Sequence, residues 1–345
     1  MFLLCTQGET MNDVFSELDV AGRRLANRVV LPPMATEQAG PEGYPGHETA
    51  AWYGSLAASG VALVVVEHST VAPEGRSSPH QISLATDAHT PGHAAIAAAI
   101  HAAGTLCAAQ ISHAGSNRRA GMPGRCLGPS AVENPVSHLV PEEMSPDDIT
   151  SVVRSFGAAA GRVRDAGYDF VEVHCAHGYL LGEFLSPLTN HRTDAYGGTP
   201  SARRRLLLEV IEEVRAAVHG DLPIMVRLGV ADNPPQVQLY QGGLSLEEGV
   251  EAARALDLAG VAILDVSAGM CGSRPPGIAG EAYFRPFAQA VSAAVHTHVV
   301  CTGGITLPQT ARDVIASGTA DLVGVGRAIA ADHDWVRKAR EALDS

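Results

Sequence analysis

The chain has 345 residues, 46% of them hydrophobic, and a formal net charge of −13. This length allows one large domain or two ordinary ones, and the charge argues against a nucleic acid or an anionic membrane as a partner. The six cysteines include no Cys-x-x-Cys spacing, which argues against an iron–sulfur or zinc-ribbon cluster, and their scatter fits a reducing cytoplasm.

Residues 1–13 are predicted to be a flexible extension that precedes the folded domain. The apolar run at residues 1–5 follows no positively charged segment and is too short for a signal peptide or a membrane span. We therefore expect a cytoplasmic protein with one folded domain at residues 14–345.

From residue 29 onward, short runs rich in Val, Ile and Leu alternate with Ala-rich or amphipathic helical stretches. The runs predict strands at residues 29–34, 61–67, 106–110, 170–174, 223–228, 263–267, 299–302 and 322–326. The stretches between and after them predict helices at residues 48–58, 92–103, 146–166, 201–218, 246–259, 284–294, 307–317 and 334–343. Capping sequences that begin at Ser145 and Ser245 support the start of two of these helices.

Eight strand–helix units in a chain of this length predict a single (β/α)₈ TIM barrel, an α/β fold, rather than an open sheet. No Gly-x-Gly-x-x-Gly follows the first strand, which argues against the usual dinucleotide-binding opening. We expect residues 14–27 to cap the bottom of the barrel. The long segment at residues 112–145 is expected to pass over the top, where long loops are usually functional.

Polar residues follow abruptly where the predicted fourth strand ends, with His174, His177 and Tyr179 close together. Imidazoles donate hydrogen bonds to a carbonyl oxygen and a phenol can supply a proton, so this group suits a substrate carbonyl and the carbon beside it. The same residues also fit an ordinary polar strand end or a satisfied histidine pair. Together with Cys175 they fit a metal site as well.

Glycines follow the last two predicted strands, at Gly303 and Gly304 and again at Gly326, where Arg327 comes next. Glycine allows backbone N–H groups to approach a phosphate closely, and arginine adds a charge-assisted fork. The loops that follow strands seven and eight are the usual phosphate site of this fold. The alternative is that both segments are simply tight turns.

Two polar side chains end other predicted strands, namely Gln110 on the third and Arg227 on the fifth. An arginine within an apolar run needs an anionic or strongly accepting partner, and glutamine offers both a donor and an acceptor. The pair suits the pyrimidine edge of an isoalloxazine ring. The alternative for Arg227 is a structural ion pair with Glu172 or Asp265.

From about residue 14 to residue 335 the chain resembles the old yellow enzyme family, the NADH:flavin oxidoreductases that act as FMN-dependent ene-reductases. The most specific match is the central block of residues 171–180 (VEVHCAHGYL) and 184–198 (FLSPLTNHRTDAYGG). Further matches are residues 27–34 (NRVVLPPM), 109–115 (AQISHAG) and 128–130 (GPS), with the glycines and arginine named above.

The resemblance implies a role for each matching residue. His174 and His177 correspond to the pair that binds the activating oxygen of the substrate, and Tyr179 corresponds to the proton donor. Flavin contacts are implied for Pro33, Met34, Ala35, Gln110 and Arg227, and the phosphate site for Gly303, Gly304, Gly326 and Arg327.

The resemblance also implies the reaction. NADH or NADPH reduces FMN, and the reduced flavin passes hydride to the activated C=C bond of an α,β-unsaturated carbonyl compound or another electron-poor substrate. Neither a metal, a nucleic acid nor a membrane is implied, and family members often form homo-oligomers.

Four features depart from the family pattern. Ala35 stands where many relatives carry Thr or Cys, as in the branch of enoate and dienoyl-CoA reductases. That branch usually carries an iron–sulfur motif and a further flavin domain, neither of which is expected here. His68 stands where relatives usually have a small residue beneath the flavin, as a flavin contact or as an inert variant. Loops at residues 231–240 and 269–280 are expected to set substrate choice, with Tyr240 as a wall of the pocket.

Three alternatives remain at this point. A flavin-dependent dehydrogenase, desaturase or amine demethylase of the same family would use the same cofactor. A metal-dependent barrel hydrolase would use His174, Cys175 and His177 as ligands. A silent flavin-binding scaffold would bind FMN without turnover.

Overall fold

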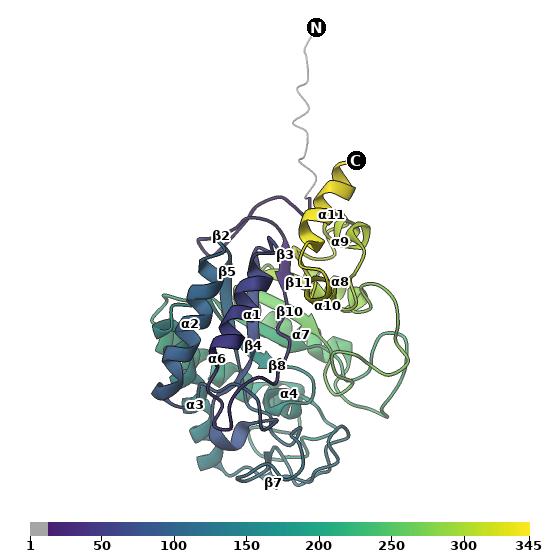
Figure 1. Ribbon diagram of the computed structural model, residues 1–345. Coiled ribbons are helices and arrows are strands. Elements are labelled where there is room, and N and C mark those ends of the chain that lie inside the picture. The colour runs from purple at the N-terminus through teal and green to yellow at the C-terminus, as the bar shows by residue number, and fades with distance from the viewer. Residues whose placement is uncertain (1–12) are drawn as a thin grey trace.

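The computed structural model describes residues 13–345 and contains a closed barrel of eight strands (Figure 1). Every neighbouring pair of barrel strands is parallel. The strands are β3 (Val29–Leu31), β4 (Leu63–Thr70), β5 (Leu106–Ser112), β8 (Phe170–Cys175), β9 (Ile224–Gly229), β10 (Ile263–Ser267), β11 (His298–Thr302) and β12 (Leu322–Gly324). The predicted (β/α)₈ barrel is therefore confirmed.

Helices cover the outside of the barrel. The main ones are α1 (His47–Ala57), α2 (Thr90–His101), α3 (Pro146–Asp165), α6 (Arg205–Val218), α7 (Leu246–Leu258), α8 (Arg285–Ser292), α9 (Pro308–Ala316) and α11 (Trp335–Asp344). Shorter helices are α4 (Leu180–Leu185), α5 (Pro200–Arg203) and α10 (Arg327–Ala331). The predicted capping boxes at Ser145 and Ser245 are present at the starts of α3 and α7.

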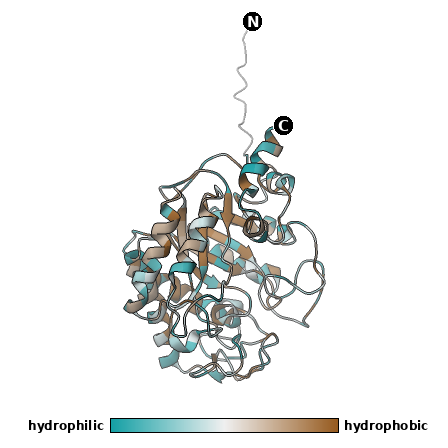
Figure 2. Ribbon diagram, in the orientation of Figure 1, coloured by the Kyte–Doolittle hydropathy of each residue, from teal (hydrophilic) through white to brown (hydrophobic). Residues whose placement is uncertain are grey.

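The strands are buried on both faces, which explains their continuous apolar runs. One cluster fills the barrel interior and includes Phe170, Met225 and Ile263. The residues that alternate with them along each strand point outward and pack against the helices. Figure 2 shows the barrel strands as the most apolar ribbon, surrounded by helices of mixed polarity. None of the helices that the structure describes has the length and apolar character of a membrane span.

The amino end of the barrel is closed by a hairpin, as predicted for residues 14–27. Strands β1 (Leu18–Val20) and β2 (Arg23–Leu25) pair in antiparallel fashion. Val20 and Leu25 are fully buried and join the cluster inside the barrel. Most of the predicted flexible extension, residues 1–13, lies outside the described residues.

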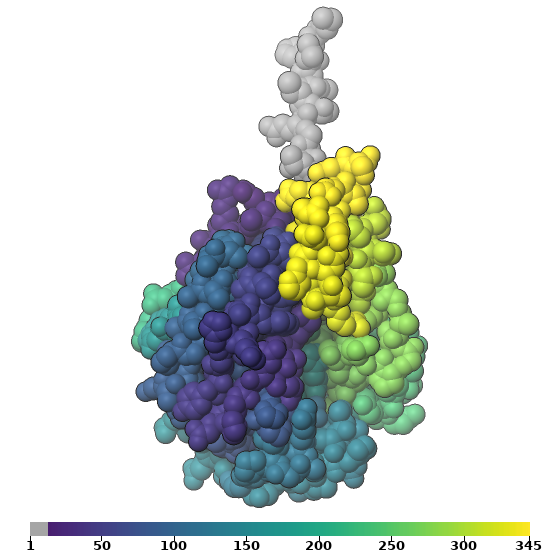
Figure 3. Space-filling model, viewed as in Figure 1, coloured from purple at the N-terminus to yellow at the C-terminus, as the bar shows by residue number. Residues whose placement is uncertain are grey.

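The last helix returns to the beginning of the described chain, where α11 packs beside the first strand–helix unit (Figure 3). The guanidinium of Arg340 lies 4.5 Å from the centre of the Phe15 ring. Val336 and Ala339, also on α11, are buried in the hydrophobic cluster between the barrel strands and the surrounding helices. This contact completes the helical layer where the two ends of the barrel chain meet.

Two long loops lie at the carboxyl end of the barrel. The predicted excursion after β5 contains a small parallel pair, β6 (Leu127–Gly128) and β7 (Glu142–Glu143), before α3 begins. The second loop follows β10 and ends at α8. Both loops contribute residues to the cavity described next.

Candidate active site

A cavity of about 450 Å³ opens at the carboxyl ends of the barrel strands, within the usual size range of small-molecule sites. Every predicted site residue except Tyr240 lines it. These residues are Pro33, Met34, Ala35, His68, Gln110, His174, His177, Tyr179, Arg227, Gly303, Gly304, Gly326 and Arg327. Residues up to about 290 positions apart in sequence therefore share one surface, because they end neighbouring strands.

The turn after β8 holds two imidazoles over the end of the strand. His177 has a φ of 58°, an uncommon backbone conformation for a residue with a side chain. Its backbone is fixed from two sides, since Asn117 donates to its carbonyl oxygen at 2.7 Å and its own N–H donates to the Ala268 carbonyl at 3.0 Å. The surrounding loops thus stabilise a turn that points His177 back toward His174.

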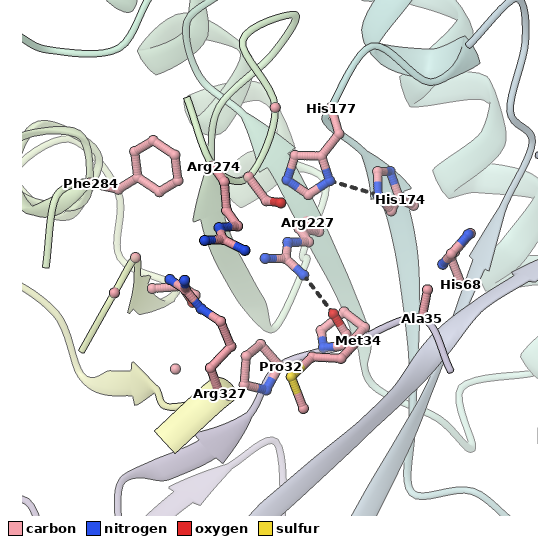
Figure 4. A pocket seen from close by; sticks show the side chains of 18 of the residues that line it. Pro32, Met34, Ala35, His68, His174, His177, Arg227, Arg274, Phe284 and Arg327 are labelled. Carbon is pink, nitrogen blue, oxygen red and sulfur yellow. Dashed lines mark hydrogen bonds between the residues drawn. The ribbon is translucent and has the colours of Figure 1, made fainter. Parts of the chain in front are cut away.

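Hydrogen bonds define the tautomers of this pair. The Ala176 N–H donates to Nδ1 of His174 at 3.3 Å, so the proton of a neutral His174 sits on Nε2. That nitrogen lies 3.2 Å from Nδ1 of His177 (Figure 4). Nε2 of His177 lies 2.7 Å from the Ser267 hydroxyl. A chain of donors therefore runs from His174 through His177 to Ser267.

Both imidazoles are uncharged at neutral pH. Burial lowers the pKa of His174 and of His177 well below the usual value, and the nearby Arg227 cation lowers both further. Neutral imidazoles of this kind act as hydrogen-bond donors rather than as counter-ions.

Tyr179 lies beside the pair. Its ring stacks on that of His174, with centroids 4.7 Å apart and planes 27° apart. Burial raises the pKa of Tyr179, while a hydrogen bond with the Ser77 side chain opposes this shift. The phenol therefore keeps its proton at neutral pH and remains able to donate it.

A row of charged and polar side chains crosses the barrel from β5 to β11. Gln110 donates to Glu172 at 2.6 Å, and Nε of Arg227 lies 3.3 Å from a carboxylate oxygen of Asp265. The predicted alternative of an ion pair between Arg227 and Asp265 is therefore present. Arg227 nevertheless lines the cavity, with Nη1 3.5 Å from the Pro33 carbonyl.

This row contains buried polar atoms without a hydrogen-bond partner among the described residues. They are Oε1 of Glu172 and Nε of Arg227. Burial and the neighbouring Asp265 raise the pKa of Glu172 to about 8, so this carboxyl is protonated at neutral pH. Arg227 then balances the single negative charge of Asp265.

The turns after β11 and β12 leave little room for side chains. Gly304 has a φ of +74°, and a Cβ atom there would lie 2.6 Å from the Gly280 carbonyl oxygen and 2.8 Å from the Tyr283 ring. A Cβ atom at Gly326 would lie 3.0 Å from the sulfur of Met34. Exposed Arg327 stands at the edge of these turns, so bare backbone and a cation meet at one rim of the cavity.

His68 lies within β4, which is longer than predicted. The strand continues to Thr70 after a register shift between Val66 and Ser69. The Glu67 carboxylate is bound by the N–H and the hydroxyl of Thr36, at 2.8 and 2.6 Å. His68, the next residue, instead lines the cavity.

Sequence reasoning missed several lining residues. Asn117 and Val136 come from the loop after β5, and Arg274, Tyr283 and Phe284 from the loop after β10. The loops predicted to be functional, residues 112–145 and 269–280, contain Asn117, Val136 and Arg274, but no local pattern marks these residues. Tyr283 and Phe284 lie beyond the predicted loop, and Phe284 was predicted to begin a helix. Tyr240 lies outside the lining, with its hydroxyl 3.3 Å from the Met270 carbonyl.

Within residues 13–345, one group of three side chains has the spacing of a metal site, and it is not the one considered from the sequence. It consists of His101, Cys107 and Asp169, at the amino ends of β5 and β8, away from the cavity. One Asp169 oxygen already accepts from the His101 ring and from the Cys107 N–H, at 2.8 Å each. Hydrogen bonds between two neighbouring strand starts account for this group.

Comparisons with known proteins point to one family. The model of the NADH:flavin oxidoreductase / NADH oxidase family matches residues 13–345. The chain is 36% identical over 336 residues to an NADH oxidase of Thermoanaerobacter brockii, covering 95% of this chain and 51% of that protein. The chain thus spans about half the length of this relative.

Two further proteins match over nearly their whole length. An NADPH dehydrogenase of Bacillus licheniformis is 35% identical over 335 residues, which cover 96% of this chain and 95% of that protein. The structure of an old yellow enzyme homologue from Zymomonas mobilis superposes with a TM-score of 0.82 at 25% identity, over 96% of this chain and 93% of that one.

Proposed function

We propose a function from the premise that the chain belongs to the NADH:flavin oxidoreductase / NADH oxidase family. The protein is an FMN-dependent oxidoreductase that uses NADH or NADPH and reduces the activated C=C bond of an α,β-unsaturated carbonyl compound or a related electron-poor substrate. The observation that carries this proposal is one cavity that brings together His174, His177 and Tyr179 with Arg227 and the glycine turns.

The residues of the cavity fit FMN. Arg227 is buried, charged and only partly partnered, as required beside a ring edge that takes up negative charge. Gln110, which also lines the cavity, offers an amide to the same kind of edge. The close turns at Gly304 and Gly326, with Arg327 beside them, would hold the phosphate.

When bound, FMN would supply the hydride chemistry that links NADH or NADPH to the β-carbon of the substrate. The part of this chain is to hold the substrate oxygen, on which negative charge develops. His174 presents an N–H from Nε2, which a substrate oxygen can accept in place of Nδ1 of His177. The Ser267 hydroxyl can donate to Nε2 of His177 as well as accept from it, so Nδ1 of His177 can also become a donor.

Tyr179 protonates the α-carbon of the substrate. Its phenol is protonated at neutral pH, and stacking on His174 keeps it next to the oxygen-binding pair. Proton transfer to carbon completes the reduction without placing a charged acid in the cavity.

The test is a comparison of the two half-reactions in Tyr179→Phe. We expect the oxidative half-reaction with an enone to slow by about 100-fold or more, because the acid is lost. Reduction by NADH or NADPH should remain within about twofold, since the phenol takes no part in it. Both rates are measured by following the flavin absorbance after rapid mixing.

Tyr240→Phe is the matched control, because its hydroxyl lies outside the cavity lining and contacts a backbone carbonyl. It should leave both half-reactions unchanged. Equal slowing of both half-reactions in Tyr179→Phe would exclude Tyr179 as the proton donor. A purified protein with no flavin spectrum and no affinity for FMN would exclude the function itself.

The cytoplasm is the compartment that we propose. Cys107, Cys126, Cys175, Cys271 and Cys301 are unpaired, and all but Cys126 are buried. Free thiols in this number fit a reducing compartment. Self-association is a further prediction, which a measurement of molecular mass in solution tests.

A further inference from the structure

His68 lies close enough to Tyr179 to act on it. The two rings are 5.6 Å apart between centroids, with 58° between their planes. Both side chains line the cavity, and His68 stands next to Ala35, on the far side from Arg327 (Figure 4). No step described so far uses this imidazole.

A buried hydroxyl connects the two rings. Nε2 of His68 lies 3.3 Å from Oγ of Ser77, and the interaction of the same Ser77 side chain with the Tyr179 phenol lowers the pKa of that phenol. Ser77 is only 8% exposed. A hydroxyl can both donate and accept, so it is able to pass a proton between an imidazole and a phenol.

Gln81 holds this hydroxyl in place. Its Oε1 accepts from the Ser77 N–H at 2.7 Å and from the Ser77 hydroxyl at 3.2 Å. Its Nε2 donates to the His68 carbonyl at 2.9 Å. One fully buried amide thus fixes both the backbone that carries the imidazole and the hydroxyl that bridges to Tyr179.

We propose that His68 and Ser77 form a proton relay that restores the Tyr179 phenol after each turnover. This inference rests on the proposed function. After Tyr179 has given its proton to the substrate carbon, the phenolate takes the proton of the Ser77 hydroxyl. Ser77 takes the Nε2 proton of His68, and Nδ1 of His68 takes a proton from water, which leaves hydroxide in the solvent. The ring then releases its Nδ1 proton to solvent and regains one on Nε2, which resets it for the next turnover. One proton of water thus enters for each proton that Tyr179 gives to the substrate.

The outer end of the relay faces charged groups near the surface. Glu37 influences both His68 and Tyr179 electrostatically. Its carboxylate lies 3.3 Å from the exposed Arg119 and accepts from the Ser78 hydroxyl at 2.8 Å. The Glu37 side chain is 35% exposed, so solvent reaches this carboxylate.

The charge of His68 determines how the relay works. Burial lowers the pKa of His68 to about 4, Glu37 raises it and Arg227 lowers it. At neutral pH the imidazole is therefore uncharged and stores no extra proton. It must receive a proton on one nitrogen as it releases one from the other, which only a two-nitrogen ring can do.

The experiment follows the Tyr179 phenolate directly. The flavin-loaded, reduced protein is mixed with one equivalent of an enone, and the tyrosinate absorbance in the near ultraviolet is recorded after hydride transfer. In His68→Ala and in Ser77→Ala we expect decay of the phenolate to be slowed by about tenfold relative to the rate of hydride transfer measured in the same variant. Added imidazole should restore the decay in His68→Ala but not in Ser77→Ala.

Two further variants separate a relay from a merely structural contact. Ser78→Ala removes the neighbouring hydroxyl, which binds Glu37 instead, and should leave the decay unchanged. His68→Gln keeps a donor for Ser77 but has no second ring nitrogen, so its decay should stay slow. Parent-like decay in His68→Gln or in Ser77→Ala would overturn the relay.

The outcome for the relay is distinguishable from the outcome for the proposed function. If Tyr179→Phe also performs the oxidative half-reaction at the parent rate, the assignment of Tyr179 fails and the relay fails with it. If Tyr179→Phe is slow while His68→Ala and Ser77→Ala match the parent protein, only the relay is refuted. A near-ultraviolet titration of the phenol in His68→Ala, which needs no turnover, checks that the Tyr179 environment is intact.

Discussion

The two sides of the cavity differ in the exposure and charge of their titratable groups. Figure 4 shows Arg274 and Arg327 on one side and His68 and His174 on the other. On the arginine side the cations are exposed and the backbone is bare. This side comprises Gly303, Gly304, Gly326, Arg274 and Arg327. On the imidazole side the groups are enclosed and uncharged at neutral pH, and this side comprises His68, His174, His177 and Tyr179.

The difference separates holding a ligand from promoting a reaction. Exposed arginines keep their hydration and attract an anion at little cost to the folded state. Enclosed neutral donors add little attraction for a neutral ligand but stabilise negative charge that develops beside them. Arg227 lies between the two sides and is both buried and charged. We therefore expect substitution of this residue to have a larger effect on stability than substitution of an exposed arginine.

The largest expected effect comes from breaking the buried charge balance at Arg227. Arg227→Gln leaves Asp265 without its cation, and we expect the free energy of unfolding to fall by about 3–5 kcal/mol. Arg327→Gln, on the exposed rim, should change it by less than about 0.5 kcal/mol. Denaturant unfolding of both variants measures the difference, and equal small losses would show that Asp265 becomes protonated at no cost.

The second effect concerns the glycine turns of the arginine side. In Gly304→Ala the new Cβ atom would lie 2.6 Å from a backbone oxygen, so the turn must move. We expect the dissociation constant for FMN to rise by roughly 10- to 100-fold. It is measured by flavin fluorescence on adding FMN to apoprotein.

Gly318→Ala is the matched control for this change. Gly318 also has a positive φ, +67°, but a Cβ atom there meets nothing within 4 Å. It should therefore carry a similar backbone cost while FMN affinity stays at the parent value. Similar losses of affinity in both variants would assign the effect to the backbone conformation rather than to the cavity.

The smallest effect is the pH dependence of the imidazole side. His68 has a pKa of about 4 when folded, against a usual value of 6.5. Between these values the unfolded chain binds one more proton, so the free energy of unfolding falls as the pH falls through 6.5 and levels off near 4. From pH 7 to pH 5, His68→Ala should lose roughly 1–2 kcal/mol less than the parent protein.

Arg327→Gln provides the contrast for this measurement, because an arginine stays charged throughout this pH range. Its loss of stability from pH 7 to pH 5 should equal that of the parent protein. An unchanged pH dependence in His68→Ala would mean that water solvates the imidazole in the folded protein.

The strand boundaries show where sequence reasoning stops. The first strand was predicted to reach residue 34, but β3 ends at Leu31, because Pro32 and Pro33 have no N–H to continue the ladder. The second was predicted to end at residue 67, but β4 continues to Thr70. Its pairing with β5 resumes at Ser69 after an irregularity that no local pattern announces.

The sequence predicted the lining residues at the strand ends more completely than those in the connecting loops. Gln110, His174 and Arg227 stand at strand ends, and parallel strands in a barrel bring their carboxyl ends to one face. Arg274 and Phe284 were missed, since they lie within a loop whose course depends on its contacts with the rest of the chain. Tyr240, predicted as a pocket wall, lies outside the lining.

The sequence alone determined the eight strand–helix units, the barrel and the strand ends that carry its polar residues, because hydrophobic period and punctuation are local properties of a chain. Only the tertiary structure decided which of these residues meet. The ion pair of Arg227 with Asp265 and the contact of His68 with Ser77 depend on side-chain directions and on a strand irregularity. The tautomers of His174 and His177 likewise depend on the hydrogen bonds around them, which exist only in the folded chain.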